Sequence, residues 1–224
     1  MRRTLSAIVI CMAFAAAAAA QAQQSQTRPA PPPKPAELDG PHAGHHMPEQ
    51  AKQPESPAQK WFTDVELLDQ DGRKVRFYTD MLKGKTIVVN AFFTSCTSVC
   101  PPMNRNLEKV QEALGARLGK DVFLISISVD PTTDTPPRLK EYAKRFHARE
   151  GWTFLTGKKE NVDWALYKLG QYVESRDDHT TIIIVGNETT GLWKKALGMA
   201  KADELIQIVN SVANDKGADE GGSK

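Results

Sequence analysis

Three runs of apolar, largely β-branched residues constrain the fold of this 224-residue chain more than any other feature. The runs occupy residues 86–93, 122–129 and 181–185. A strand with one face in water alternates apolar and polar residues, whereas a nearly continuous apolar run suits a strand that is buried on both faces. We therefore predict a central β-sheet that is covered by helices.

Apolar residues at helical spacing lie between these strands and after the last of them. The first stripe repeats at intervals of 4, 3, 4 and 4 residues, which is the periodicity of an amphipathic helix. In chain order, the three stripes are Met103, Leu107, Val110, Leu114 and Leu118; then Leu139, Tyr142, Ala143 and Phe146 within residues 136–148; and finally Leu205, Ile208, Val209 and Val212.

Two short gaps between strands predict β-hairpins. The dipeptide Asp71-Gly72 divides residues 64–78 into two alternating stretches, and it readily adopts the positive φ angles of a tight turn. Residues 186–191 separate the third apolar run from a last short strand at residues 192–196. The order of these elements predicts an α/β fold, a thioredoxin-like sandwich with a central mixed sheet flanked by helices and an N-terminal β-hairpin.

The first 22 residues have the pattern of a secretory signal peptide. Arg2 and Arg3 precede an apolar run at residues 5–20, and the leader ends on Ala-x-Ala at residues 20–22. We predict cleavage after residue 22 and export to the periplasm. If the leader is retained, its apolar run is close to the roughly 17-residue minimum for a membrane anchor.

Cleavage would change the charge and the cysteine count. The chain has 29 Lys and Arg against 27 Asp and Glu, a formal charge of +2, and the leader holds two arginines and no acids. The mature protein would therefore be neutral, and we expect no nucleic-acid partner. Cys11 would be lost with the leader, so that Cys96 and Cys100 alone would remain, in an oxidising compartment.

The remaining sequence divides into a tether, a domain and a tail. Residues 23–58 are rich in Gln, Pro, Ala and Lys and contain almost no large apolar residue, so they cannot bury enough surface to fold. Residues 215–224 form a polar tail of the same kind. We predict one folded domain at residues 59–214, a size that supports a single core.

The two cysteines stand where the first buried strand gives way to a helix. Pro101 and Pro102 fit only before or within the first helical turn, which places Cys96 and Cys100 in the preceding loop and that turn. Unpaired N–H groups there stabilise a thiolate. Three residues separate the cysteines, close to one helical turn, so both sulfurs can face one side. Such a pair can bind a soft cation such as Cu(I) or Zn(II), or close a redox-active or purely structural disulfide.

Four segments in sequence give the chain a resemblance to the Sco/SenC family over about residues 61–214. They are residues 94–101 (TSCTSVCP), 128–136 (SVDPTTDTP), 152–157 (WTFLTG) and 178–181 (DHTT). The resemblance implies a thioredoxin fold in which two motif cysteines and a distant histidine bind copper. It also implies a role in assembling the dinuclear copper centre, CuA, of cytochrome c oxidase.

On this resemblance, Cys96 and Cys100 match the motif cysteines and His179 matches the ligand histidine. Spacing alone would favour a surface or core role for His179 over a ligand role. Thr97 stands where many members have proline, which affects the stiffness of the loop more than the identity of the ligands.

For other polar residues, the sequence gives weaker indications of a role at this site. Asp134 is expected to cap the helix that follows it, and Asp130 or Asp178 could hold the tautomer of the His179 ring. The predicted tether carries three further histidines, which could collect copper loosely or be incidental linker residues: His42, His45 and His46.

We therefore expect a periplasmic copper chaperone rather than an enzyme in the strict sense. Its copper, Cu(I) or Cu(II), would be held by Cys96, Cys100 and His179 and passed to the apo subunit of cytochrome c oxidase that carries CuA. The alternative is a thiol–disulfide oxidoreductase that uses Cys96 and Cys100 to reduce a partner's cysteines before metal insertion. A peroxidase on the same fold is less favoured, because no arginine stands next to Cys96 in the sequence.

Overall fold

The computed structural model describes residues 30–33, 57–62 and 64–217. Within these ranges, no helix is both long and apolar enough to cross a membrane. Three predictions fall wholly or largely outside the described residues: the leader at residues 1–22, most of the tether with His42, His45 and His46, and the end of the tail at residues 218–224.

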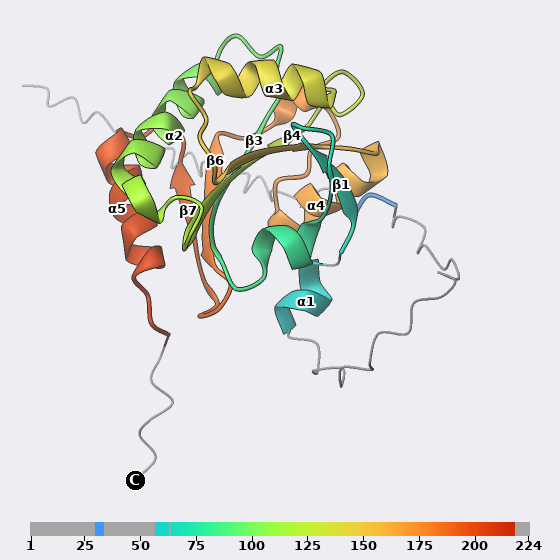
Figure 1. Cartoon of the computed structure of the whole chain (residues 1–224). Coiled ribbons are helices and arrows are strands. Elements are labelled where there is room, and N and C mark those ends of the chain that lie inside the picture. The colour runs from blue at the N-terminus through green and yellow to red at the C-terminus, as the bar shows by residue number, and fades with distance from the viewer. Residues whose placement is uncertain (1–29, 34–56, 63, 218–224) are drawn as a thin grey trace, which may run out of the picture.

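The predicted mixed sheet is present, and in the described part of the chain it has seven strands (Figure 1). The strands are β1 (Glu66–Asp69), β2 (Lys74–Arg76), β3 (Thr86–Phe92), β4 (Val122–Ser128), β5 (Trp152–Thr156), β6 (Ile182–Asn187) and β7 (Leu192–Leu197). Their order across the sheet is β2-β1-β5-β4-β3-β6-β7. Strands β5, β4 and β3 run parallel, and an antiparallel hairpin extends the sheet on each side.

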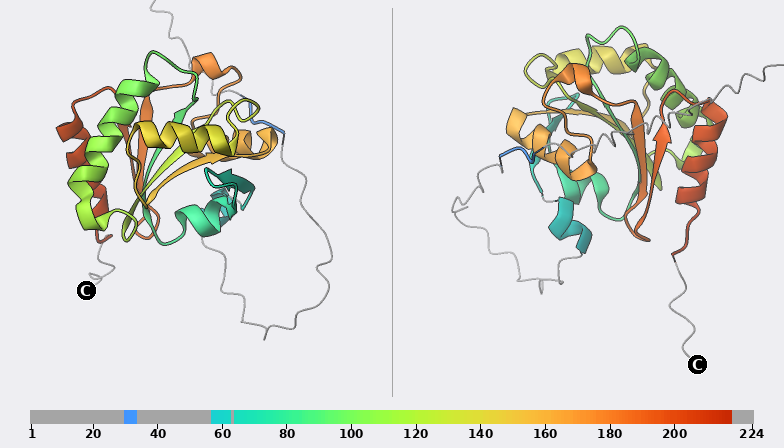
Figure 2. Two further views of the ribbon diagram at one scale, coloured as in Figure 1. Left: turned by 45° about the horizontal axis from the view of Figure 1, so that its top comes forward. Right: turned by 180° about the vertical axis from the view of Figure 1, so that it is seen from behind.

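Helices cover both faces of the sheet (Figures 1 and 2). The α-helices are α1 (Pro57–Phe62), α2 (Cys100–Leu114), α3 (Pro136–Arg145), α4 (Lys159–Leu169) and α5 (Ala202–Ala213). Helical segments of other types are η1 (Phe77–Leu82), η2 (Gly115–Arg117) and η3 (Arg176–Asp178). Helices α2, α3 and α5 pack on one face, and α1, α4 and η1 pack on the other.

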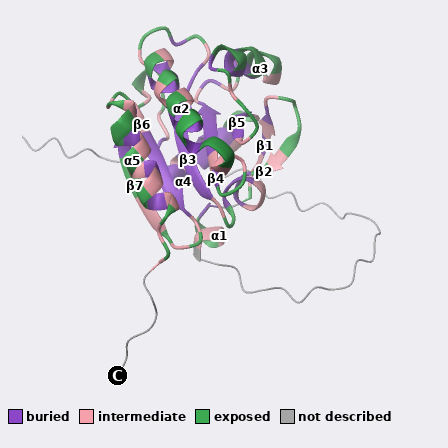
Figure 3. Cartoon of the chain, turned by 60° about the vertical axis from the view of Figure 1, so that its left-hand side comes forward, coloured by how far each residue is buried: buried purple, intermediate pink, exposed green. Residues whose placement is uncertain are grey.

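Strand β3, which lies beside the middle strand β4, is buried from end to end (Figure 3). Successive side chains of a strand point to opposite faces, so Val88 and Phe92 join the core beneath α2, α3 and α5. Ile87 and Val89 join the second core, beneath α1 and α4. The continuous apolar run of β3 is therefore explained by burial on both faces, as predicted.

Both predicted hairpins are present. Strands β1 and β2 pair with Glu66 opposite Arg76, and Gly72 between them has φ of +78°. Strands β6 and β7 also pair antiparallel, but β6 continues through Asn187, so Gly186 lies within the strand opposite Trp193. The second turn is thus shorter than the predicted gap.

Several elements differ from the sequence predictions. Strand β5 and helices α1 and α4 were not predicted, and helix α3 ends at Arg145 rather than near residue 148. Helix α2 ends at Leu114, because Gly115 with φ of +53° breaks the helical path. The next apolar residue of the predicted stripe, Leu118, packs against the same core from outside the helix.

The topology brings two segments that are distant in the sequence to the same end of the sheet, beside each other at the ends of two neighbouring strands. Strand β3 pairs antiparallel with β6, with Asn90 opposite Ile183. The chain that leaves β3 after Phe92 therefore starts beside the chain that enters β6 at Ile182. These two segments carry the cysteines and His179.

Candidate metal centre

The two cysteines lie at the junction predicted from the sequence. Cys96 lies in the loop after β3, and Cys100 is the first residue of α2, followed by Pro101 and Pro102 in the first turn. Cys96 is 7% exposed and Cys100 is fully buried, and both thiols are free. The backbone N–H of Cys100 donates to the Cys96 sulfur at 3.4 Å, so the start of the helix contacts that sulfur directly.

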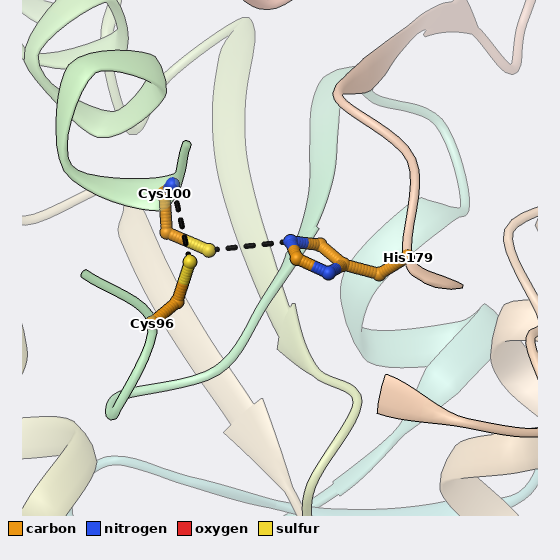
Figure 4. A group of neighbouring side chains, drawn as sticks. All are labelled: Cys96, Cys100 and His179. Carbon is orange, nitrogen blue, oxygen red and sulfur yellow. Dashed lines mark hydrogen bonds between the residues drawn. The ribbon is translucent and has the colours of Figure 1, made fainter. Parts of the chain in front are cut away.

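His179 meets this pair from the other segment (Figure 4). It follows η3 directly, and its Nε2 lies 3.3 Å from Cys100 Sγ. The ligand atoms of Cys96, Cys100 and His179 all lie within 4.8 Å of one another. The fold thus brings together the three residues that the sequence singled out as metal ligands, across 79 positions of chain between Cys100 and His179.

A backbone carbonyl fixes the tautomer of the His179 ring. Nδ1 lies 2.8 Å from the carbonyl oxygen of Arg176, and because a carbonyl can only accept, Nδ1 carries the proton and donates it. In the neutral ring, Nε2 then has the free lone pair that a metal ligand requires, and it faces the sulfurs. The prediction that a carboxylate of Asp130 or Asp178 holds this ring directly was wrong, because the Arg176 carbonyl occupies Nδ1.

The two thiols have opposite pKa shifts. Burial by itself would raise the pKa of Cys96, but hydrogen bonds from Cys100 and Ser98 outweigh it and hold that pKa below its ordinary value. Burial raises the pKa of Cys100 to about 12, and its hydrogen bond to Cys96 acts in the same direction. Cys100 therefore keeps its proton until a metal displaces it, and its sulfur lies beside Nε2 of His179.

Asp134 supports the cysteine loop instead of capping a helix. Its carboxylate is fully buried and accepts hydrogen bonds from the backbone N–H and the hydroxyl of Thr94 and from the hydroxyl of Ser128. Helix α3 begins after Thr135, whose side chain makes no capping hydrogen bond. The predicted cap was wrong because donors of the partly buried Thr94 and the buried Ser128, which the sequence pattern did not reveal, occupy this carboxylate.

The donor set fits a soft metal ion. Two sulfurs and one imidazole nitrogen suit Cu(I) or Zn(II), and no carboxylate belongs to this group among the described residues, so it lacks the oxygen ligands that Mg²⁺ or Ca²⁺ prefers. A three-donor set of this kind can hold Cu(I) and can accept a further ligand for Cu(II).

Comparison with known proteins places this site in a family context. A curated relative, the SCO1 protein homolog of Bacillus subtilis, is 34% identical over 118 residues, which cover 51% of this chain and 60% of that protein. The alignment therefore spans less than two thirds of that relative's length.

Two solved structures have the same fold. Arabidopsis thaliana ScoI with copper bound superposes with a TM-score of 0.56 at 26% identity, covering 67% of this chain and 96% of that one. BsSco, described as a member of the Sco family of cytochrome c oxidase assembly proteins with a disulfide switch, gives a TM-score of 0.57 at 28% identity, covering 69% and 94%. The SCO1/SenC family model matches residues 53–214, and the chain belongs to the SCO1/SenC family.

Proposed function

We propose that this protein is a copper metallochaperone that binds copper through Cys96, Cys100 and Nε2 of His179. The observation that carries the proposal is the meeting of these three ligand atoms within 4.8 Å, with both thiols free and Nδ1 of His179 held by the Arg176 carbonyl. The copper-bound structure of a family member supports copper over zinc as the metal.

The acceptor that we propose is the apo subunit of cytochrome c oxidase that carries the CuA site. The description of BsSco as belonging to a family of oxidase assembly proteins supports this choice. The leader pattern at residues 1–22 supports a periplasmic location, either as a released protein or as one anchored by that segment.

Copper is the cargo in this scheme, and the protein's own residues control its binding and release. Binding requires Cys96 and Cys100 to be reduced and to lose their protons, so an oxidised pair cannot hold copper. Release to a partner would proceed by exchange of ligands, with each sulfur and the imidazole replaced in turn by a donor of the acceptor. Oxidation of the pair to a disulfide would therefore switch copper loading off.

A second function, thiol–disulfide exchange, is favoured by the pKa asymmetry of the pair. The Cys96 thiolate would attack a disulfide of the partner, which forms a mixed disulfide and releases one partner thiolate. Cys100, once deprotonated, would attack the Cys96 sulfur and release the second partner thiol. The partner gains two electrons, the Cys96–Cys100 pair becomes a disulfide, and a thiol reductant must supply two electrons to restore it.

Copper titration of the reduced protein and of His179→Ala separates these functions. The chaperone proposal predicts that the variant binds copper more weakly by about tenfold or more, because a ligand is lost, while both proteins reduce a test disulfide equally. His147→Asn is the matched control: this exposed histidine pairs with Glu108 and has φ of +48°, a conformation that asparagine tolerates. Equal copper affinity in wild type and His179→Ala, with disulfide reduction intact, would remove the chaperone proposal.

A further inference from the structure

The loop that carries His179 has little apolar packing to hold it in place. Every residue at positions 174–178 is exposed, and these residues belong to no strand. A ligand on such a loop would sample many positions unless polar contacts fix it, and that loss of freedom would weaken metal binding.

Arg176 supplies such contacts with its side chain. The guanidinium forms an ion pair with Asp130, the residue that follows β4 by two positions, and lies over the ring of Phe93 at 5.2 Å from the ring centre. Phe93 in turn meets the His179 ring edge to face, at 5.1 Å between centres. One arginine thus ties the His179 loop to both the β4 end and the cysteine loop.

Asp130, the acidic partner in this ion pair, is held by hydrogen bonds of its own. Asp130 is 8% exposed, its backbone N–H donates to the hydroxyl of Ser128, and its carboxylate accepts from the hydroxyl of Thr132. Ser128 is itself bound to the buried Asp134 that supports the cysteine loop. The anchor of Arg176 is therefore part of the same scaffold that positions Cys96.

The backbone of Arg176 acts on His179 at the same time. Its carbonyl oxygen accepts from Nδ1 of the ring at 2.8 Å and from the backbone N–H of His179 at 3.3 Å. Moving the Arg176 side chain away from Asp130 would move the carbonyl that sets the tautomer of the ring.

We propose that Arg176 and Asp130 form a latch that positions His179, holding Nε2 toward the cysteine sulfurs before copper arrives. Neither residue is a metal ligand in this proposal; both are positioning residues. The latch rests on the proposed copper site, and it explains how an exposed loop can deliver a ligand with a fixed orientation.

The test compares Arg176→Ala, Asp130→Asn and Arg176→Lys with wild type. The first readout needs no metal: long-range proton–nitrogen NMR of the reduced protein reports which nitrogen of His179 carries the proton. Wild type is expected to show the Nδ1–H tautomer, and Arg176→Ala and Asp130→Asn a mixture of both. Arg176→Lys keeps the positive charge but loses the planar contact with Phe93, so it should recover part of the effect.

The second readout is copper affinity by competition with a chromophoric chelator, together with the absorption spectrum of the Cu(II)-loaded protein. Arg176→Ala is expected to lower copper affinity by about tenfold and to shift the sulfur-to-copper absorption. Loss of a group that holds a metal-ligating histidine in place typically lowers metal affinity by about 10–100-fold. Arg117→Ala is the matched control, since its ion pair with Asp121 lies just before β4, at the other end of that strand from Asp130. It should change neither readout.

Failure of the latch is distinguishable from failure of the proposed function. If wild type binds copper and Arg176→Ala keeps the wild-type affinity, spectrum and tautomer, the latch is wrong and the copper site stands. If wild type binds no copper, the proposed function fails, and the NMR comparison of the reduced proteins still decides whether Arg176 positions the ring.

Discussion

Cys96 and Cys100 carry the same side chain in different surroundings, and the difference predicts how each reacts. Hydrogen bonds lower the pKa of Cys96, so its thiolate is present at lower pH than for an ordinary cysteine. Burial keeps Cys100 protonated up to a pKa of about 12. The reactive form of Cys96 therefore appears first as pH rises.

Alkylation of the reduced, metal-free protein tests this order. Between about pH 7 and 9, iodoacetamide should label Cys96 first, and unlabelled Cys100 should persist in tryptic peptides analysed by mass spectrometry. Equal labelling rates at the two positions across that range would contradict the assignment.

The roles of residues at this site could be predicted only where a family resemblance or a local sequence pattern indicated them. Cys96 and Cys100 were found from their place before Pro101, because strand-to-helix junctions present side chains in a known way. The role of His179 rested on family resemblance, since no local pattern ties it to a cysteine 79 positions away. Arg176 was missed because its partner, Asp130, lies 46 positions earlier and only the folded chain brings them together.

Among the elements, the loop between β3 and α2 depends on one buried carboxylate. Replacing Asp134 by Ala would leave the Thr94 and Ser128 donors without their shared acceptor. A buried donor left unpaired costs about 1–3 kcal/mol, Ser128 is fully buried and Thr94 partly so. We therefore expect a loss of about 3 kcal/mol in the free energy of unfolding, measured by urea denaturation. Asp121→Ala, which removes an exposed ion pair with Arg117, should cost under about 1 kcal/mol. Similar values for the two variants would contradict the support role of Asp134.

The β6–β7 hairpin makes a second prediction. A Cβ added at Gly186 would lie 2.2 Å from the ring of Trp193, far inside contact distance. Gly186→Ala should therefore destabilise the protein by about 1–3 kcal/mol, and should cost much less in a Trp193→Leu background, where the ring is gone. Urea denaturation of the four proteins of this cycle measures the coupling, and additive effects would show that the ring does not enforce glycine here.

The same glycine shows why element boundaries were harder to predict than element types. Gly186 was taken as the start of a turn, since glycine most often marks one, but it is a strand residue beside a large ring. Leu118 was placed in a helix because it continues the helical spacing of the apolar stripe, although it packs on the core from beyond Gly115. In both cases a tertiary contact, not a local preference, decides the residue's place.

At the scale of the whole molecule, the sheet and its two covered faces were predictable because burial on both faces leaves a continuous apolar run. Strand β5 escaped prediction because its five residues, Trp152–Thr156, are too few to show a clear period. Helix α4 carries a usable signal in its buried positions Val162, Leu166 and Leu169. Residues 93–100 and 176–181 meet at one end of the sheet because β3 pairs with β6, and the sequence alone does not specify that pairing.

In the proposed copper site, the sulfurs of Cys96 and Cys100 and the imidazole of His179 bind one copper ion together. X-ray absorption at the copper edge, on the reduced protein loaded with one equivalent of Cu(I), measures that ligand set directly. We expect scattering from two sulfurs and one imidazole nitrogen, with the imidazole signal lost in His179→Ala and both sulfurs retained. A wild-type spectrum without imidazole, or with fewer than two sulfurs, would contradict it.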